Sequence, residues 1–247
     1  MEMTTDDLFS CIGGHALGLS AAGPFRTIRF VESNSWRQQI LSRHFPGVPI
    51  YDDIHTTRGI TADILVGGPP CQQTVSLAAI HGHRTGASLW PEMRRLSQEG
   101  QYRWIIVEQP ASASQEWFTQ VAGDLAADGY HVARVSITAA SLGAPHQRRR
   151  MFTVAHRDMP RLEIAWRSIA SETERITRGT SSGNAWNESI PGTLRVDSGV
   201  SCRMDGSAKQ RRERIEALGD SNPPVMMTVI GRAVLAAEIG RAMESTE

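Results

Sequence analysis

Short apolar runs alternate with helix-like segments along the first 156 residues, and this alternation constrains the fold more than any other feature. The apolar runs lie near residues 5–9, 27–32, 62–66, 103–108, 131–137 and 150–155. The helix-like segments lie near residues 14–22, 35–44, 88–99 and 114–128. Strands that alternate with helices favour an open, largely parallel α/β sheet with helices on both faces. Ligands of such sheets bind beyond the carboxyl ends of the strands.

The rest of the chain departs from this alternation. Residues 157–207 contain a stretch rich in Ser, Gly and Asn with little periodicity, which predicts a small irregular region. One helix is predicted to end at Gly219. A second helix is predicted over residues 225–243, after the sequence DSNPP. We therefore divide the chain into a main domain at 1–156, a small region at 157–207 and a carboxyl-terminal segment at 208–247.

Charge alone does not identify a partner, because the formal net charge of the 247-residue chain is zero. The basic side chains are 25 arginines and one lysine, Lys209. This bias has two interpretations: a GC-rich coding sequence, or recognition of phosphates and bases by arginine.

The three cysteines, at 11, 71 and 202, have no disulfide or zinc spacing and predict a reducing compartment, with no metal site. No apolar stretch predicts a membrane span and the acidic amino terminus is no signal peptide, so we expect a cytoplasmic protein.

Three features predict a nucleotide-like ligand. The sequence DDLFSCIGGHALGL at 6–19 fits a strand, a glycine turn and a helix whose amino end can approach a ligand. Glu32 closes the next apolar run, where an acid commonly binds ribose hydroxyls. Asp53 and Ile54 follow, and an acid there can accept a hydrogen bond from an adenine amino group. Together they favour an adenosine ligand, either a dinucleotide or S-adenosylmethionine.

Three further groups are predicted to meet at the same edge of the sheet. The sequence GGPPC places Cys71 on a stiff loop after one apolar run, and VEQP places Glu108 at the end of another. The sequence HQRRR sets three arginines, 148–150, before a further strand. A thiolate can add to C6 of a cytosine while a carboxylic acid at N3 and an arginine at O2 stabilise the adduct. C5 then attacks a methyl sulfonium and a base removes the C5 proton.

These motifs together resemble the DNA (cytosine-5) methyltransferases, in particular small phage and prophage members. DLFSCIGG is similar to the cofactor loop, GGPPCQ to the proline-cysteine motif, HQRRR to the Gln-x-Arg-x-Arg motif and EALGDSNPP to the late Gly-Asn-x-Val-Pro motif. The resemblance implies a Rossmann-like methyltransferase sheet, with 157–207 as the target-recognition region.

The resemblance also implies roles for individual residues. The catalytic set would be Cys71, Glu108, Arg148 and Arg150, with Arg150 at cytosine O2 and Arg148 helping to hold Glu108. S-adenosyl-L-methionine, leaving as S-adenosyl-L-homocysteine, would be bound by Phe9, Ser10, Cys11, Gly13, Gly14, Glu32, Ser33, Asp53, Ile54, Gly68, Pro70 and Asp220.

Five positions depart from the family pattern. Cys11 stands for a glycine, Gln109 and Pro110 for Asn-Val, His146 for a glutamine and Asp220 for an asparagine. The asparagine replaced by Gln109 normally braces the catalytic loop. Asp220 would repel the methionine carboxylate of the cofactor unless an amine or an arginine intervenes.

The implied substrate is double-stranded DNA, from which the target cytosine must flip to meet Cys71. The loop at 72–86 would close over the DNA, where His81, His83 and Arg84 can meet phosphates. We expect a monomer that modifies phage or host DNA. Two other hypotheses stay open from the residues: a DNA-binding relative without catalysis, and a nicotinamide-dependent oxidoreductase.

Overall fold

A computed structural model describes residues 2–70, 88–111, 113, 115–180 and 208–244. Seven strands form one sheet in the order β3-β2-β1-β4-β5-β7-β6. Their bounds are Met3–Leu8 (β1), Phe25–Val31 (β2), Ile50–Tyr51 (β3), Ile64–Gly67 (β4), Trp104–Pro110 (β5), His131–Thr138 (β6) and Arg149–His156 (β7). The predicted α/β sheet is confirmed, and the sequence analysis missed only the two-residue strand β3.

The sheet is parallel except at β7. This strand lies between β5 and β6 and runs antiparallel to both. An antiparallel partner needs only a tight connection rather than a crossover helix. The chain accordingly passes from β6 to β7 through one short 3-10 helix, Ala140–Leu142.

Helices cover both faces of the sheet because its strands bury alternate residues on opposite sides. On one face, Ile64, Val66 and Ile106 pack against α1 (Gly14–Ala22), α6 (Met159–Thr180) and α9 (Pro224–Glu244). On the other, Leu65 and Ile105 pack against α4 (Trp90–Glu99) and α5 (Gln115–Ala127). Helix α2 (Ser35–His44) covers the β2–β3 end of the sheet beside α1.

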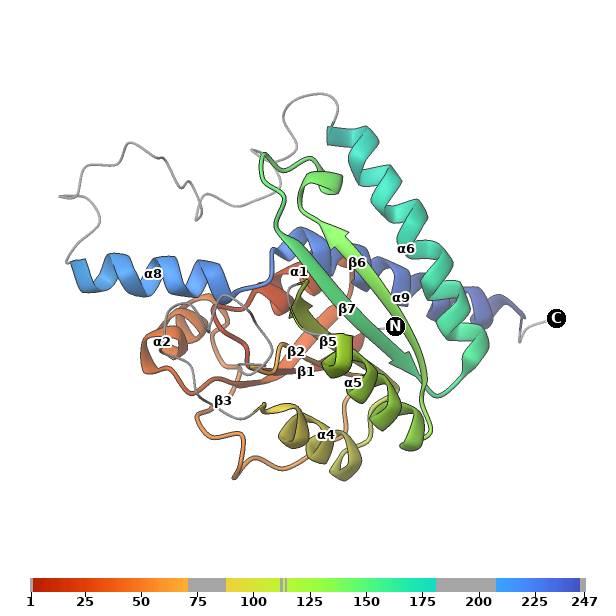
Figure 1. Cartoon of the computed structure of the whole chain (residues 1–247). Helices are drawn as coiled ribbons and strands as arrows, with labels where there is room; N and C mark the ends of the chain where they lie inside the picture. The colour runs from red at the N-terminus through yellow and green to blue at the C-terminus, as the bar shows by residue number, and fades with distance from the viewer. Residues whose placement is uncertain (1, 71–87, 112, 114, 181–207, 245–247) are drawn as a thin grey trace.

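The structure corrects the prediction of an irregular region after residue 156. Helix α6 spans 22 residues and packs against α9, which it crosses at an angle (Figure 1). Leu162, Ala165 and Ile169 recur at helical spacing and are buried in the same core as the sheet. The Ser- and Gly-rich stretch that suggested loops lies at 181–207, outside the described residues. The domain division at 156 and 207 stays a prediction.

The carboxyl-terminal segment forms two helices, α8 (Ala208–Asp220) and α9, as expected. One described stretch, Arg212–Gly240, is long and apolar enough by composition to cross a membrane, and 56% of its most apolar window is buried. That stretch is broken at residues 221–223, where α8 ends and α9 begins. The buried part of α9 packs against α1 and α6 as a core helix does.

Helix α9 is tied to the sheet by one buried carboxylate, Glu238, whose side chain is 2% exposed. It accepts hydrogen bonds from Trp104 Nε1 at 2.9 Å, from Arg103 at 2.9 Å and from Arg161. Burial by itself raises the pKa of Glu238, but the bonds from Arg161 and Trp104 outweigh it and hold the pKa below its ordinary value.

We predict that Glu238→Gln lowers the free energy of unfolding by about 2 kcal/mol at neutral pH, since it leaves two arginines without their shared anion. Because the folded-state pKa is lowered, the stabilisation is present above the ordinary carboxyl pKa and is lost as pH falls through the folded value. Urea denaturation at pH 7 and pH 4 measures both effects. The control Glu163→Gln removes a half-exposed carboxylate 3.9 Å from Arg167 and should leave stability within about 0.5 kcal/mol.

Candidate active site

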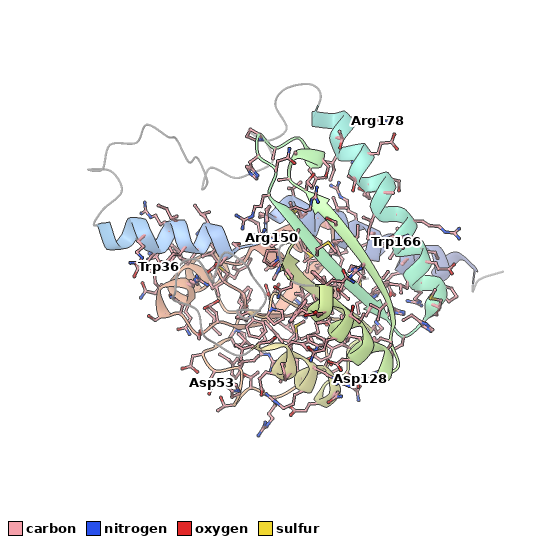
Figure 2. All side chains as sticks on the ribbon, in the orientation of Figure 1. Trp36, Asp53, Asp128, Arg150, Trp166 and Arg178 are labelled. Carbon is pink, nitrogen blue, oxygen red and sulfur yellow. The ribbon has the colours of Figure 1, made fainter. Side chains whose placement is uncertain are left out.

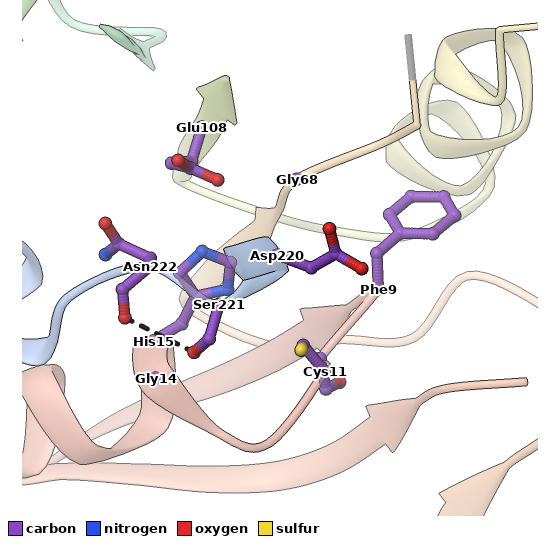
Figure 3. Close-up of a pocket in the computed structure, with 10 residues that line it drawn as sticks. Phe9, Cys11, Gly14, His15, Gly68, Glu108, Asp220, Ser221 and Asn222 are labelled. Carbon is purple, nitrogen blue, oxygen red and sulfur yellow. Dashed lines mark hydrogen bonds between the residues drawn. The ribbon is translucent and has the colours of Figure 1, made fainter. Parts of the chain in front are cut away.

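The register of three parallel strands brings the ends of β1, β4 and β5 together. Leu8 pairs with Gly67, and Gly67 pairs with Val107. The residues that follow in each strand are Phe9, Gly68 and Glu108, and they line one small cavity (Figure 3). The remaining lining residues come from the start of α1 and from the α8–α9 junction: Ser10, Cys11, Gly14, His15, Asp220, Ser221 and Asn222.

The turn between β1 and α1 has a strained backbone. Phe9 and Cys11 have φ angles of 56° and 50°, and Gly13 has 86°. A residue other than glycine at positive φ costs roughly 1–2 kcal/mol. This cost explains why the family pattern has a glycine where this chain has Cys11. Glu32 holds the turn in place, because its carboxylate accepts the backbone N–H of Cys11 at 2.8 Å and that of Asn34 at 2.8 Å.

Cys11 lies in this turn as a buried, inert thiol. Its Sγ donates to the carbonyl oxygen of Ala217 at 3.3 Å. Burial raises the pKa of Cys11 to about 12, so the thiolate is absent at neutral pH. Cys11 is therefore a packing residue that joins the β1–α1 turn to α8.

Glu108 is a fully buried carboxyl group at the end of β5. Arg150 Nε lies 2.6 Å from its Oε1, and a Cβ on Gly68 would lie 2.9 Å from its Oε2. Burial raises the pKa of Glu108, although the Arg150, His15 and Arg148 side chains oppose the rise. The carboxyl group thus keeps a proton to a higher pH than an ordinary glutamate does.

The two predicted arginines make different contacts. Arg150 lies within β7 and pairs with Glu108, because residues 108 and 150 project from the same face of the antiparallel β5–β7 pair, and the charge of Arg148 also acts on Glu108. Arg148 instead donates to the carbonyl oxygens of Gly219 at 2.8 Å and of Ser221, and so holds the α8–α9 junction.

The structure also accounts for two departures from the family pattern. Arg37 Nη2 lies 2.6 Å from Asp220 Oδ2 and offsets the carboxylate beside the cavity. Gln109 donates from its amide to the carbonyl oxygen of Pro69, so it braces the chain that leads to Cys71. Cys71 and the loop at 72–86 lie outside the described residues.

The predicted cofactor residues fall into two groups. Phe9, Ser10, Cys11, Gly14, Gly68 and Asp220 line the cavity, whereas Gly13, Glu32, Ser33, Asp53, Ile54 and Pro70 do not. Asp53 lies near the lower edge of the molecule in Figure 2, where it accepts the N–H of His55 at 2.9 Å. Ser33 is exposed and Ile54 is buried.

Comparison with known proteins identifies the family. The model of the C-5 cytosine-specific DNA methylases matches residues 3–188. The chain belongs to this family. Type II methyltransferase M2.BsuMI of Bacillus subtilis is 31% identical over 166 residues, and M.HgiDI of Herpetosiphon aurantiacus is 29% identical. These matches cover 62% and 63% of this chain but 42% and 52% of the relatives, so the chain spans about half their length.

A solved structure shows the same fold. It is described as a DNA modification methyltransferase encoded within an Escherichia coli prophage. It matches with a TM-score of 0.52 and 23% identity, over 63% of this chain and 47% of that one. The predicted family resemblance and the Rossmann-like sheet are therefore both confirmed.

Membership of a methyltransferase family implies S-adenosylmethionine as methyl donor, and the cavity offers polar groups to one end of such a molecule. Helix α1 begins at the cavity, and its N-cap residue Gly13 supplies no side-chain cap to the first N–H groups, which can face a carboxylate. The buried Asn222 amide has no hydrogen-bond partner from the described residues. No group of three or more His, Cys, Asp or Glu in the described part of the chain can hold a metal ion.

Sequence reasoning missed three lining residues: His15, Ser221 and Asn222. The signal for His15 was its position directly after the glycine pair that starts α1. Ser221 and Asn222 were part of the quoted motif DSNPP, but only Asp220 was assigned a role.

We predict that Gly14→Ala disrupts the cavity, because a Cβ there would lie 2.3 Å from the carbonyl oxygen of Asn222. Overpacking against backbone should lower stability by about 1–3 kcal/mol and weaken S-adenosylmethionine binding by more than about tenfold. Thermal melting and isothermal titration calorimetry measure the two effects. Gly123→Ala in α5, where a Cβ meets nothing within 4 Å, is the matched control and should raise stability slightly. Equal cofactor affinity in both variants would contradict the close approach.

Proposed function

We propose that this chain transfers a methyl group from S-adenosylmethionine to C5 of a flipped-out cytosine in double-stranded DNA. The observation that carries the proposal is the buried Glu108 carboxyl group, held by Arg150 at the strand edge where the cofactor loop, Gly68 and the chain leading to Cys71 converge. The chain spans about half the length of its relatives, so the complete methyl-transfer reaction belongs to this proposal.

The base is activated by this chain's own residues. The Cys71 thiolate adds to C6 of the cytosine, and Glu108 donates a hydrogen bond to N3, which its raised pKa favours. Arg150 positions the Glu108 carboxyl group and lies next to the site predicted for cytosine O2. Arg148 acts at longer range by holding the α8–α9 junction against the cavity.

The bound cofactor supplies an electrophilic methyl group on a sulfonium. We assign its methionine end to Phe9, Ser10, Cys11, Gly14, Gly68 and Asp220, with Ser221 and Asn222. We assign the ribose to Glu32 with Ser33, and the adenine to Asp53 and Ile54, with Gly13 and Pro70 shaping the two loops. Each carboxylate oxygen of Glu32 accepts one N–H and keeps a second lone pair for a ribose hydroxyl.

Recognition of DNA is assigned mostly to residues that the structure does not describe. We propose that the loop at 72–86 closes over the flipped base and that the region at 157–207, which begins with α6, reads the sequence. We propose that the protein acts as a monomer on DNA in the bacterial cytoplasm. The methylation would belong to a phage or to a restriction-modification system.

The decisive test incubates purified protein with S-adenosylmethionine and unmethylated DNA, followed by digestion to nucleosides and mass spectrometry. We predict a 5-methylcytosine signal that falls by at least about a thousandfold in Cys71→Ala, because the mechanism has no nucleophile without the thiolate. Thr119→Ala, at an exposed site on α5, is the control and should keep the activity of the unaltered chain. Methylation retained in Cys71→Ala would contradict the mechanism.

A second readout separates an active enzyme from a DNA-binding relative without catalysis. DNA that contains 5-fluorocytosine should trap the unaltered chain covalently, since fluorine cannot leave as the C5 proton does. Cofactor and DNA binding without trapping would favour the relative without catalysis.

A further inference from the structure

The α8–α9 junction carries two changed positions of one family motif. Where the pattern Gly-Asn-x-Val-Pro has an asparagine and a valine, this chain has Asp220 and Asn222. Sequence reasoning recognised the first change and missed the second. Both side chains line the cavity (Figure 3). At the edge of the cavity, a charged acceptor thus replaces an amide and an amide replaces an apolar side chain.

Asn222 is a buried side chain whose hydrogen-bonding atoms are unused. It is 3% exposed, and neither Oδ1 nor Nδ2 has a hydrogen-bond partner among the described residues. A buried polar group without a partner is destabilising, and an apolar side chain at this position would avoid that cost. The buried amide on the wall of a cavity therefore points to a ligand that offers it both a donor and an acceptor.

Asp220 has one oxygen atom in an ion pair and one that is left over. Oδ2 lies 2.6 Å from Arg37 Nη2, whereas Oδ1 has no hydrogen bond to the described residues. Arg37 is not among the residues that line the cavity, and its charge also acts on Glu32. The cavity is therefore presented with the acidic oxygen of the pair rather than with the guanidinium group.

The other charged groups around the cavity already have partners. Glu108 lies 2.6 Å from Arg150, and His15 Nδ1 lies 3.1 Å from Asp7, so a charge on either group is balanced within its pair. Arg148 donates to the carbonyl oxygens of the junction rather than to a carboxylate in the cavity. An entering cation would therefore find its acceptors at the junction.

We propose that Asp220 and Asn222 bind the ammonium group at the methionine end of S-adenosylmethionine, and that this contact contributes more to affinity than the contact with the carboxylate. Oδ1 of each residue accepts an N–H bond from the ammonium group, which has three donors and no acceptor. Nδ2 of Asn222 and the uncapped first turn of α1 donate to the carboxylate. This assignment rests on the proposed function and names the two residues that determine specificity for the amino group.

The change from asparagine to aspartate has an asymmetric effect. An asparagine amide either donates to a carboxylate or accepts from an ammonium group, whereas an ionised aspartate only accepts. A hydrogen bond between two charged groups is also roughly twice as strong as one between neutral groups. Asp220 therefore strengthens the contact with the amino group and gives up a donor to the carboxylate, which Asn222 Nδ2 replaces.

The first experiment measures ligand affinity by isothermal titration calorimetry, so it needs no catalysis. The ligands are S-adenosylhomocysteine, its analogue without the amino group and its analogue without the carboxyl group. We expect loss of the amino group to weaken binding about a hundredfold, and loss of the carboxyl group to weaken it about tenfold or less.

Two variants restore the family residues and test each position. Asp220→Asn should bind S-adenosylhomocysteine about tenfold more weakly, yet bind the amino-free analogue at least as tightly as the unaltered chain does, because the two changes remove the same contact. Asn222→Val should weaken S-adenosylhomocysteine about tenfold and the amino-free analogue by less. Glu116→Gln, at an exposed carboxylate on α5, is the control and should leave all three affinities unchanged. Thermal melting verifies that the variants are folded.

Several outcomes would overturn the proposal. An equal loss for the two analogues, or a larger loss without the carboxyl group, would assign recognition to Arg37 and the start of α1. Additive effects of Asp220→Asn and amino-group removal would show that the two groups make no contact.

The same data separate this inference from the proposed function. A preference for the amino group without formation of 5-methylcytosine would support this site and contradict the proposed reaction. Tight binding of S-adenosylhomocysteine without the preference would overturn this inference alone. No binding of any of the three ligands would overturn both.

Discussion

The candidate site depends on the register of three neighbouring parallel strands. Leu8, Gly67 and Val107 lie in one row across β1, β4 and β5, so the next residue of each strand reaches the same edge. A shift of one residue in β5 would turn Glu108 to the opposite face, because side chains alternate along a strand. The apolar run Trp104–Val107 is buried on both faces of the sheet, and its pairing with β4 in this register sets the position of the carboxyl group.

Arginine side chains offset the free-energy cost of burying carboxylates in this fold. Asp6, Glu108 and Glu238 are nearly inaccessible to solvent, and each pairs with at least one arginine. Asp6, for example, receives two hydrogen bonds from Arg29 and one from the Tyr102 hydroxyl at 2.7 Å. Planar guanidinium groups suit such sites because they donate several bonds in a fixed geometry. Part of the arginine bias thus serves the interior of the fold.

Patterns of local spacing predicted the sheet, the glycine turn and the end of each main strand. They failed where a contact depends on which face or which distant segment a side chain meets. The direct contact of Arg150 with Glu108 was not predicted, because an antiparallel neighbour of β5 had not been foreseen, and antiparallel pairing brings Arg150 to that side. Helix α6 was missed because its helical spacing adjoins the Ser- and Gly-rich stretch that dominates the composition of 157–207. His15 was missed because nothing in its local pattern reveals that it contacts Asp7 and lines the same cavity as Glu108.

The cavity also depends on the last part of the chain. Gly14 and Gly18 bring α1 against the backbone at Asn222 and Pro224, and Thr228 donates to the Gly18 carbonyl oxygen at 3.0 Å. Cys11 and Arg148 add contacts to Ala217 and Gly219. These partners lie about seventy to two hundred residues apart in sequence, so closing the loops between them costs chain entropy that the packing of α9 on α1 and α6 helps to offset. The binding cavity is therefore complete only when the carboxyl-terminal segment has docked, and formation of the site is coupled to folding of the whole chain.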